Sequence, residues 1–158
     1  MSTVAVSGFI EASAVDVWRL LTDPLSRAGR ALAGPLELLT SGPFGPGTAW
    51  SEPRRRPDGA VLVEEFWVVE AIPPRRLVLC SPGDAVDHRI TWTLRGAPRR
   101  HPGGTAVTVS LEALPSSASG RVVALLLAGL AARAVERALR GDLADLAAAV
   151  EGPTARAA

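Results

Sequence analysis

Apolar and polar positions alternate through most of the chain and then, near Pro115, change to a helical pattern. Before Pro115, alternating segments between short Gly and Pro turns predict strands. After it, residues 117–150 carry helical periodicity and predict one long helix with no strand behind it. The expected strands are 4–10, 36–40, 48–54, 61–72, 77–81, 86–94 and 105–113. Short turns between consecutive strands favour an antiparallel meander.

The predicted terminal helix has two halves of different character. Residues 122–130 are apolar on every side, whereas Leu139, Leu143, Leu146 and Val150 form a single apolar stripe. A segment that is apolar all round needs apolar neighbours on every side. A sheet that closes around the helix would supply some of them, and a ligand in an internal cavity or a partner chain would supply the rest.

Two short helices are expected between the first two strands. Ser13 and Asp16 form a capping start for the first of them, which carries Trp18. Asp23 suits an N-cap and Pro24 a first helical position, so a second short helix should end before Gly34.

Turn lengths predict which residues share the inner face of the sheet. If Arg56 pairs with Ala60 across the turn at 57–59, Trp50 lies opposite Phe66 and Glu52 lies opposite Glu64. A slip of one residue would turn Glu65 inward instead. The same count places these residues on the inner face: Val68, Leu77, Leu79, His88, Ile90, Trp92, Leu94, Val107, Val109 and Leu111.

The outer face receives an apolar group under the same count. It consists of Trp67, Val69, Val78 and Cys80. An exposed apolar patch suggests a homodimer or partner surface, and an incorrect register is the other explanation.

Three ionisable residues, Glu52, Glu64 and His88, interrupt the apolar inner face near one end. Facing carboxylates would raise one pKa through repulsion and desolvation and give an acid and base couple. Hydration at a rim, or pairing of one carboxylate with Arg54, is the structural alternative. A neutral His88 could take a proton from an acidic carbon or hold a ligand carbonyl, although strand histidines often bond only to structure. His88, Glu64 and Glu52 are therefore the catalytic candidates.

Large aromatic and aliphatic residues make up the rest of this face. Trp50, Phe66 and Trp92 would suit a flat or polyene ligand by offset stacking, and filling of the core explains them equally well. The expected ligand-binding residues are Trp50, Phe66, Val68, Leu79, Ile90, Trp92, Val109, Leu126 and Leu130.

Composition limits the function classes. The 158 residues suit a single domain over 1–158, with a frayed tail at 152–158. No metal site is expected, because the chain offers one strand histidine and one cysteine. The lone Cys80 and the lack of a signal-peptide pattern favour a cytoplasmic protein, and the apolar run at 122–132 is too short to span a membrane. A net charge of +1 gives little support to nucleic-acid binding, and the arginines at 54–56 and 99–100 are expected at solvated hairpin tips.

The order of one strand, two short helices, a meander and a long terminal helix resembles the START/SRPBCC superfamily, which includes Bet v 1-like proteins and polyketide cyclases. The matching stretches are 10–18, 21–24, 45–48, 69–77 and 139–146. This resemblance implies an α+β helix-grip fold, in which a curved antiparallel sheet of about seven strands wraps around the terminal helix. It also implies a cavity for a hydrophobic or amphipathic small molecule.

The function implied is that of a polyketide cyclase or dehydrase of secondary metabolism, an enzyme type that needs no metal or redox cofactor. A non-catalytic carrier or sensor of a hydrophobic ligand is the alternative, followed by a chaperone-associated adaptor. The chain differs from the better-known aromatic cyclases because it has no Tyr and, in the expected register, no inward Arg on the central strands.

Overall fold

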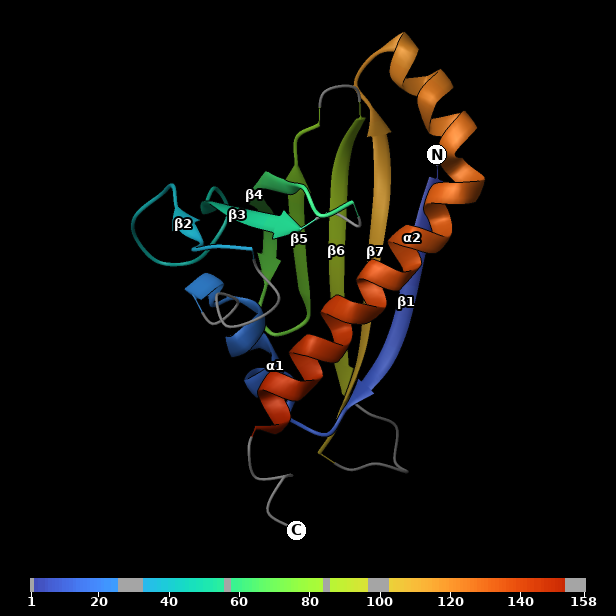
Figure 1. The fold of residues 1–158 in the computed structure, drawn as a ribbon. Helices are drawn as coiled ribbons and strands as arrows, with labels where there is room; N and C mark the ends of the chain where they lie inside the picture. The colour runs from blue at the N-terminus through green and yellow to red at the C-terminus, as the bar shows by residue number, and fades with distance from the viewer. Residues whose placement is uncertain (1, 26–32, 56–57, 84–85, 97–102, 153–158) are drawn as a thin grey trace.

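In the described part of the chain, seven strands form one antiparallel sheet and a long helix follows the last of them (Figure 1). The computed structural model describes residues 2–25, 33–55, 58–83, 86–96 and 103–152, without the side chains of 2, 118, 120, 121 and 123–131. The elements are β1 (Ser2–Ile10), α1 (Ala14–Leu21), β2 (Glu37–Leu38), β3 (Ala49–Arg55), β4 (Val61–Ile72), β5 (Arg76–Ser81), β6 (Val86–Gly96), β7 (Thr105–Pro115) and α2 (Ala118–Glu151).

The strands lie in the order β1-β7-β6-β5-β4-β3-β2. Strands β2 to β7 form the predicted meander, and β1 pairs with β7 so that the first and last strands are neighbours. The α+β helix-grip fold expected from the sequence is therefore confirmed. The strand expected at 36–40 is shorter, because only Glu37–Leu38 pairs with β3.

Helix α1 begins as its sequence predicts. The Oγ of Ser13 accepts a hydrogen bond from the backbone N–H of Asp16 at 3.2 Å and so satisfies a free donor of the first turn. The Ser13 hydroxyl also donates to Asp16 Oδ2 at 2.7 Å. The second short helix was expected over 24–32, and residues 26–32 of it lie outside the described residues.

The predicted strand register is confirmed on the β3–β4 hairpin. Trp50 pairs with Phe66 and Glu52 pairs with Glu64, so Glu65 belongs to the opposite face. The register shifts at one point between β4 and β5, where Val68 pairs with Leu79 and Glu70 pairs with Val78. Val69 is the extra residue of this irregularity. The extra residue shifts the alternation on β4, so beyond it Ala71 and not Glu70 shares the inner face with Val68.

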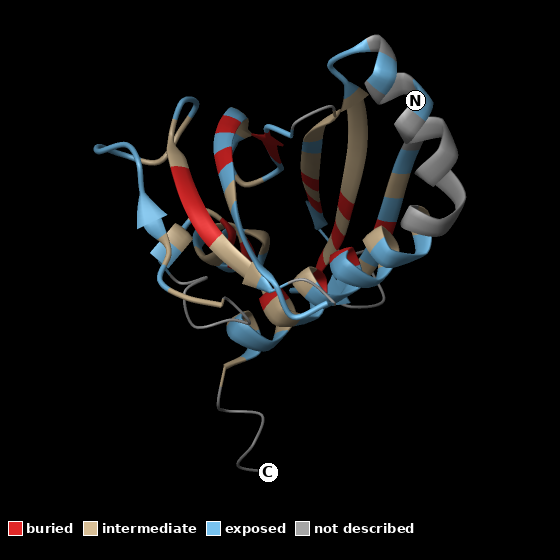
Figure 2. Cartoon of the chain, turned by 45° about the horizontal axis from the view of Figure 1, so that its top comes forward, coloured by how far each residue is buried: buried red, intermediate tan, exposed pale blue. Residues whose placement is uncertain are grey.

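Buried residues collect between the sheet and the second half of α2 (Figure 2). The predicted stripe on α2 supplies Leu139, Leu143 and Leu146, which are 3%, 8% and 1% exposed. Along the strands, buried positions alternate with more exposed ones, as expected for a sheet with one covered face. The core therefore depends on the amphipathic half of the helix.

The helix α2 lies mainly over β1 and β7 and less over β6. Gly8 of β1 allows this approach. A Cβ atom at Gly8 would lie 2.7 Å from Cδ2 of Leu143, closer than two carbon atoms can pack. A side chain at this position would force the Leu143 side chain or the helix to shift.

We expect Gly8→Val to lower the free energy of unfolding by about 1 to 3 kcal/mol, the usual cost of overpacking a core. Urea unfolding measures this change. The control is Ala5→Val on the exposed face of the same strand, which adds similar bulk without meeting the helix. Equal stability of the two variants would show that Gly8 does not set the distance between helix and strand.

The outer face carries the four apolar residues that the register predicted there. Trp67 pairs with Cys80, which agrees with that register. Val78 and Cys80 are buried, whereas Trp67 and Val69 are 37% and 46% exposed.

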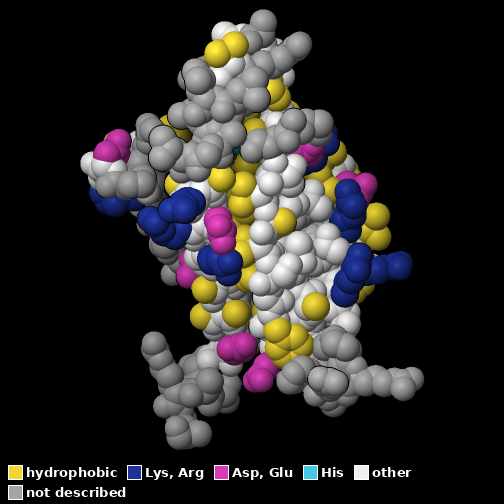
Figure 3. All heavy atoms as spheres, turned by 90° about the vertical axis from the view of Figure 1, so that its right-hand side faces the viewer, with side chains coloured by type: hydrophobic (Ala, Val, Ile, Leu, Met, Phe, Trp, Pro, Cys, Tyr) yellow, Lys and Arg dark blue, Asp and Glu magenta, His cyan; other side chains and the backbone are white. Residues whose placement is uncertain are grey.

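On the side of the molecule that carries the edge strand β1, apolar side chains and charges of both signs are interspersed (Figure 3).

Candidate functional site

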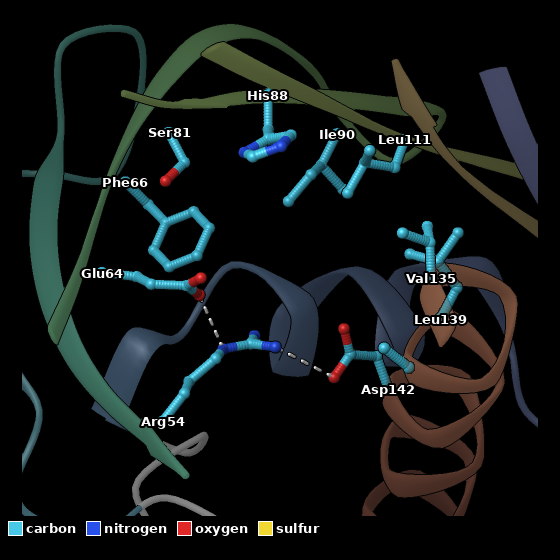
Figure 4. A pocket seen from close by; sticks show the side chains of 11 residues that line it. Arg54, Glu64, Phe66, Ser81, His88, Ile90, Leu111, Val135, Leu139 and Asp142 are labelled. Carbon is cyan, nitrogen blue, oxygen red and sulfur yellow. Dashed lines mark ion pairs between the residues drawn. The ribbon is translucent and has the colours of Figure 1, made fainter. Parts of the chain in front are cut away.

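A cavity of about 240 Å³ lies between the inner face of the sheet and the middle of α2 (Figure 4). Five strands and the helix contribute to it, because residues that pair directly across neighbouring strands have their side chains on the same face of the sheet. Its described lining consists of Arg54, Glu64, Phe66, Ser81, His88, Ile90, Leu111, Val135, Ala138, Leu139 and Asp142. The volume is just below the range of about 300 to 1,000 Å³ for ligand pockets, which suits a small ligand.

The cavity has two polar walls separated by apolar side chains. Figure 4 shows Ser81 and His88 on one side and the ion-paired Glu64, Arg54 and Asp142 on the other. The apolar side chains are Phe66, Ile90, Leu111, Val135 and Leu139. A ligand between the walls could therefore bury an apolar body and place polar atoms at both ends.

Arg54 is the centre of one polar wall. Its Nη2 lies 2.7 Å from Glu52 Oε1, its Nε lies 3.3 Å from Glu64 Oε2, and its Nη1 lies 3.8 Å from Asp142 Oδ1. The guanidinium carbon also lies 5.7 Å from the centre of the Phe66 ring. Arg54 thus connects β3, β4 and α2 at the edge of the cavity.

Arg54 acts as a fixed positive charge in this wall. Burial on its own would lower the pKa of the Arg54 guanidinium, but Asp142, Glu52 and Glu64 outweigh burial and raise this pKa above its ordinary value. A raised folded-state pKa means that the stabilisation is complete below the ordinary value and is lost only as pH rises through the folded value. Arg54 therefore stays protonated through the working pH range and cannot serve as a proton donor.

Glu52 lies behind the cavity wall. Its side chain is 1% exposed, and both oxygens have partners: Arg54 Nε donates to Oε1 at 2.8 Å and Trp50 Nε1 donates to Oε2 at 3.2 Å. Trp50 in turn stacks on Phe66 with ring centres 5.8 Å apart. This arrangement gives Glu52 a structural task, which is to hold the arginine and the tryptophan in place.

Ser81 and His88 form the opposite polar wall. They are directly paired on β5 and β6, so their side chains lie next to each other on the same face. Ser81 is 5% exposed and His88 is half-buried. Neither side chain makes a hydrogen bond to another described residue, and both line the cavity. Their polar atoms are therefore available to a ligand.

The sequence model of the family described as "Polyketide cyclase / dehydrase and lipid transport" matches residues 1–151. The chain belongs to this family. No curated protein matches the sequence.

Several solved structures have a similar fold. TTHA0849 from Thermus thermophilus is 20% identical, with a TM-score of 0.69 and coverage of 96% of this chain and 99% of that one. A protein from Arthrobacter aurescens is 16% identical, with a TM-score of 0.67 and coverage of 96% and 87%. The di-domain ARO/CYC BexL from the BE-7585A biosynthetic pathway is 20% identical, with a TM-score of 0.65. The chain covers 94% of its own length in that match and about half, 48%, of BexL.

In this member of the polyketide cyclase/dehydrase and lipid transport family, the cavity brings together only some of the residues predicted from the sequence. Glu64, His88, Phe66 and Ile90 line it. Trp50, Val68, Leu79, Trp92 and Val109 are at most 2% exposed and belong to the core around it, outside its described lining. The side chains of Leu126 and Leu130 lie outside the described residues.

The cavity also contains residues that sequence reasoning missed. Arg54 was expected at a solvated hairpin tip, and this was wrong, because it faces inward and binds three carboxylates. The alternative that a carboxylate pairs with Arg54 is confirmed for Glu52 and Glu64. The alternation of side chains along the strand could have shown that Arg54 faces inward. Arg54 follows Trp50 and Glu52 at every second position of β3, so all three belong to the same face. Ser81 has the same parity as Leu77 and Leu79. Asp142 gave no comparable signal, because its position depends on how the helix is rotated above the sheet.

Two classes of site are not found in the described residues. No group of three or more His, Cys, Asp or Glu side chains there could hold a metal ion. No helix of the described chain is both long enough and apolar enough to cross a membrane.

Proposed function

We propose that the cavity binds a hydrophobic or polyketide-like small molecule and that the protein is a cofactor-independent cyclase or dehydrase of secondary metabolism. The observation that carries this proposal is an apolar cavity with His88 on one wall and Glu64 on the other. A ligand held between these walls has a titratable group on each side. Family membership supports the same reaction class, and BexL is an ARO/CYC protein of a biosynthetic pathway.

In the reaction that we propose, a neutral His88 removes a proton from a carbon activated by a neighbouring carbonyl. The electron pair of that C–H bond forms an enolate, whose oxygen can accept a hydrogen bond from Ser81. Attack of the enolate carbon on a second carbonyl closes a ring and leaves an alkoxide, which takes back the proton held by His88 and becomes a hydroxyl. In the dehydration that follows, the again neutral His88 removes a second C–H proton and returns it to the leaving hydroxyl. Water departs, and the electron pair of the broken C–H bond forms a C=C bond. Glu64 orients the reacting hydroxyl by accepting its hydrogen bond.

Removing the His88 or Glu64 side-chain group should lower the rate of the reaction while the protein still binds its ligand. We expect His88→Ala to lower kcat by about 100-fold or more, the usual contribution of a general base, with a small change in ligand Kd. Glu64→Gln should lower kcat by a smaller factor. Native mass spectrometry of the purified protein identifies a co-purified ligand, and turnover and Kd of that ligand are then measured for both variants. Control variants are Arg89→Gln and Glu112→Gln, which alter an ion pair outside the described cavity lining.

A non-catalytic carrier is the second candidate, and two observations favour it. The family description includes lipid transport, and one of the three predicted catalytic residues, Glu52, is fully engaged in structural contacts. A carrier predicts that His88→Ala and Glu64→Gln change Kd with no turnover to lose. Ligand binding without conversion in the native protein would therefore select the carrier and reject the cyclase.

A further inference from the structure

We infer that the cavity selects a ligand without negative charge, whose polar groups are hydroxyl, carbonyl or amine groups and not a carboxylate or phosphate. This inference rests on the proposed ligand-binding function and adds the substrate class. It comes from the charges on one wall of the cavity and the unpaired polar groups on the other.

The charged wall is acidic. Of the described lining residues, Arg54 is the only one with a permanent positive charge, whereas Glu64 and Asp142 are both carboxylates. Glu52 adds a third carboxylate directly behind Arg54. Among the described residues, one guanidinium thus faces three carboxylates.

Arg54 has little capacity left for an anionic ligand. Its Nε and Nη2 lie within 3.3 Å of glutamate oxygens, and its Nη1 faces Asp142 at 3.8 Å. An entering carboxylate would have to displace one of these oxygens and would lie beside the remaining two. At such distances, repulsion between like charges in a partly buried site is large. A hydroxyl or ammonium group can instead donate to Glu64 without displacing it.

The opposite wall favours the same kind of ligand. Ser81 is 5% exposed, lines the cavity and makes no hydrogen bond with another described residue. Figure 4 shows its hydroxyl directed toward the space beside Phe66 and His88. A buried hydroxyl is stabilised when it finds a partner. A ligand carbonyl or hydroxyl can be this partner, because a serine hydroxyl both donates and accepts.

The two walls together describe a neutral or cationic ligand with an apolar middle. Its oxygen or nitrogen atoms would lie at opposite ends, one near Ser81 and His88 and one near Glu64 and Asp142. Free fatty acids and other hydrophobic carboxylates would be rejected, although their apolar parts suit the cavity equally well.

The test uses octylamine, octanol and octanoate, which share one apolar chain and differ in charge near neutral pH. Isothermal titration calorimetry of the full chain gives the three Kd values. We expect octylamine and octanol to bind at least about tenfold more tightly than octanoate. The double variant E64Q/D142N should reduce the preference for octylamine over octanoate by about tenfold, because it removes two carboxylates from the cavity wall.

The control is E136Q, which removes a carboxylate from the same helix. Glu136 pairs with Arg140 at 2.8 Å on the helix surface and does not belong to the described lining. The preference should stay unchanged in this variant. Equal or tighter binding of octanoate to the native protein would overturn the inference and leave the proposed ligand-binding function intact. Failure of all three compounds to bind would overturn both.

Discussion

Replacing Arg54 by methionine is expected to lower the free energy of unfolding by about 3 to 5 kcal/mol, as for other buried ion pairs that lose one partner. The variant keeps much of the apolar bulk over Phe66 but removes the charge that three carboxylates share. Glu52 is the costly partner, because it is 1% exposed and would remain buried with only Trp50 as a donor. Urea unfolding followed by tryptophan fluorescence measures the change.

A matched pair of glutamines tests this explanation. Glu52 and Glu64 bind the same guanidinium, but their side chains are 1% and 34% exposed. Glu64→Gln should cost less than about 1 kcal/mol, because a partly exposed ion pair contributes little. Adding Glu52→Gln to Arg54→Met should recover part of the lost stability, since the uncompensated charge is then gone. A double variant less stable than Arg54→Met would contradict the assignment of the cost to the buried carboxylate.

Leu146→Ala is expected to lower the free energy of unfolding by about 3 kcal/mol, within the range for large-to-small changes in a core. Leu146 is 1% exposed and belongs to the stripe by which α2 packs on the sheet. Truncation removes buried apolar surface and leaves a cavity that the surrounding strands can close only in part. Chemical denaturation gives the magnitude.

The same helix provides the comparison for Leu146. Val122 lies in the half that the sequence shows as apolar on every side, yet it is 57% exposed. Val122→Ala should change stability by less than about 0.5 kcal/mol, as at other surface positions. A loss similar to that of Leu146→Ala would mean that another molecule covers this half of the helix in solution.

The fold could be predicted because the sequence has two clear periodicities, the two-residue period of strands and the helical period of about 3.6 residues. Alternation along the strands and the stripe at Leu139, Leu143 and Leu146 identified the elements and their buried sides. Turn lengths then gave the β3–β4 register, which the structure has as predicted. The bulge at Val69 did not disturb this prediction, because it lies beyond the residues that form the charged wall.

The site could be predicted only in part. The alternation along a strand shows which face a side chain belongs to, but it does not show which residues that side chain contacts. It placed Glu52 and Glu64 on the same side, but it could not show that one is buried behind Arg54 and the other lines the cavity. Long side chains such as arginine reach across several positions, and their direction follows from charges on other elements. Asp142 is one such charge, and its approach depends on the rotation of α2.

The position of α2 over β1 and β7 has a consequence for how such a protein can diverge. The residues that anchor the helix, Leu143 and Leu146, differ from those on the strands that shape the cavity, such as Ser81 and Ile90. Substitutions on β5 and β6 can therefore enlarge, narrow or recharge the chamber while the anchor of the helix stays the same. A combinatorial library at the cavity-lining positions Ser81, His88 and Ile90 would therefore change ligand selection and leave the packing of Leu143 and Leu146 in place.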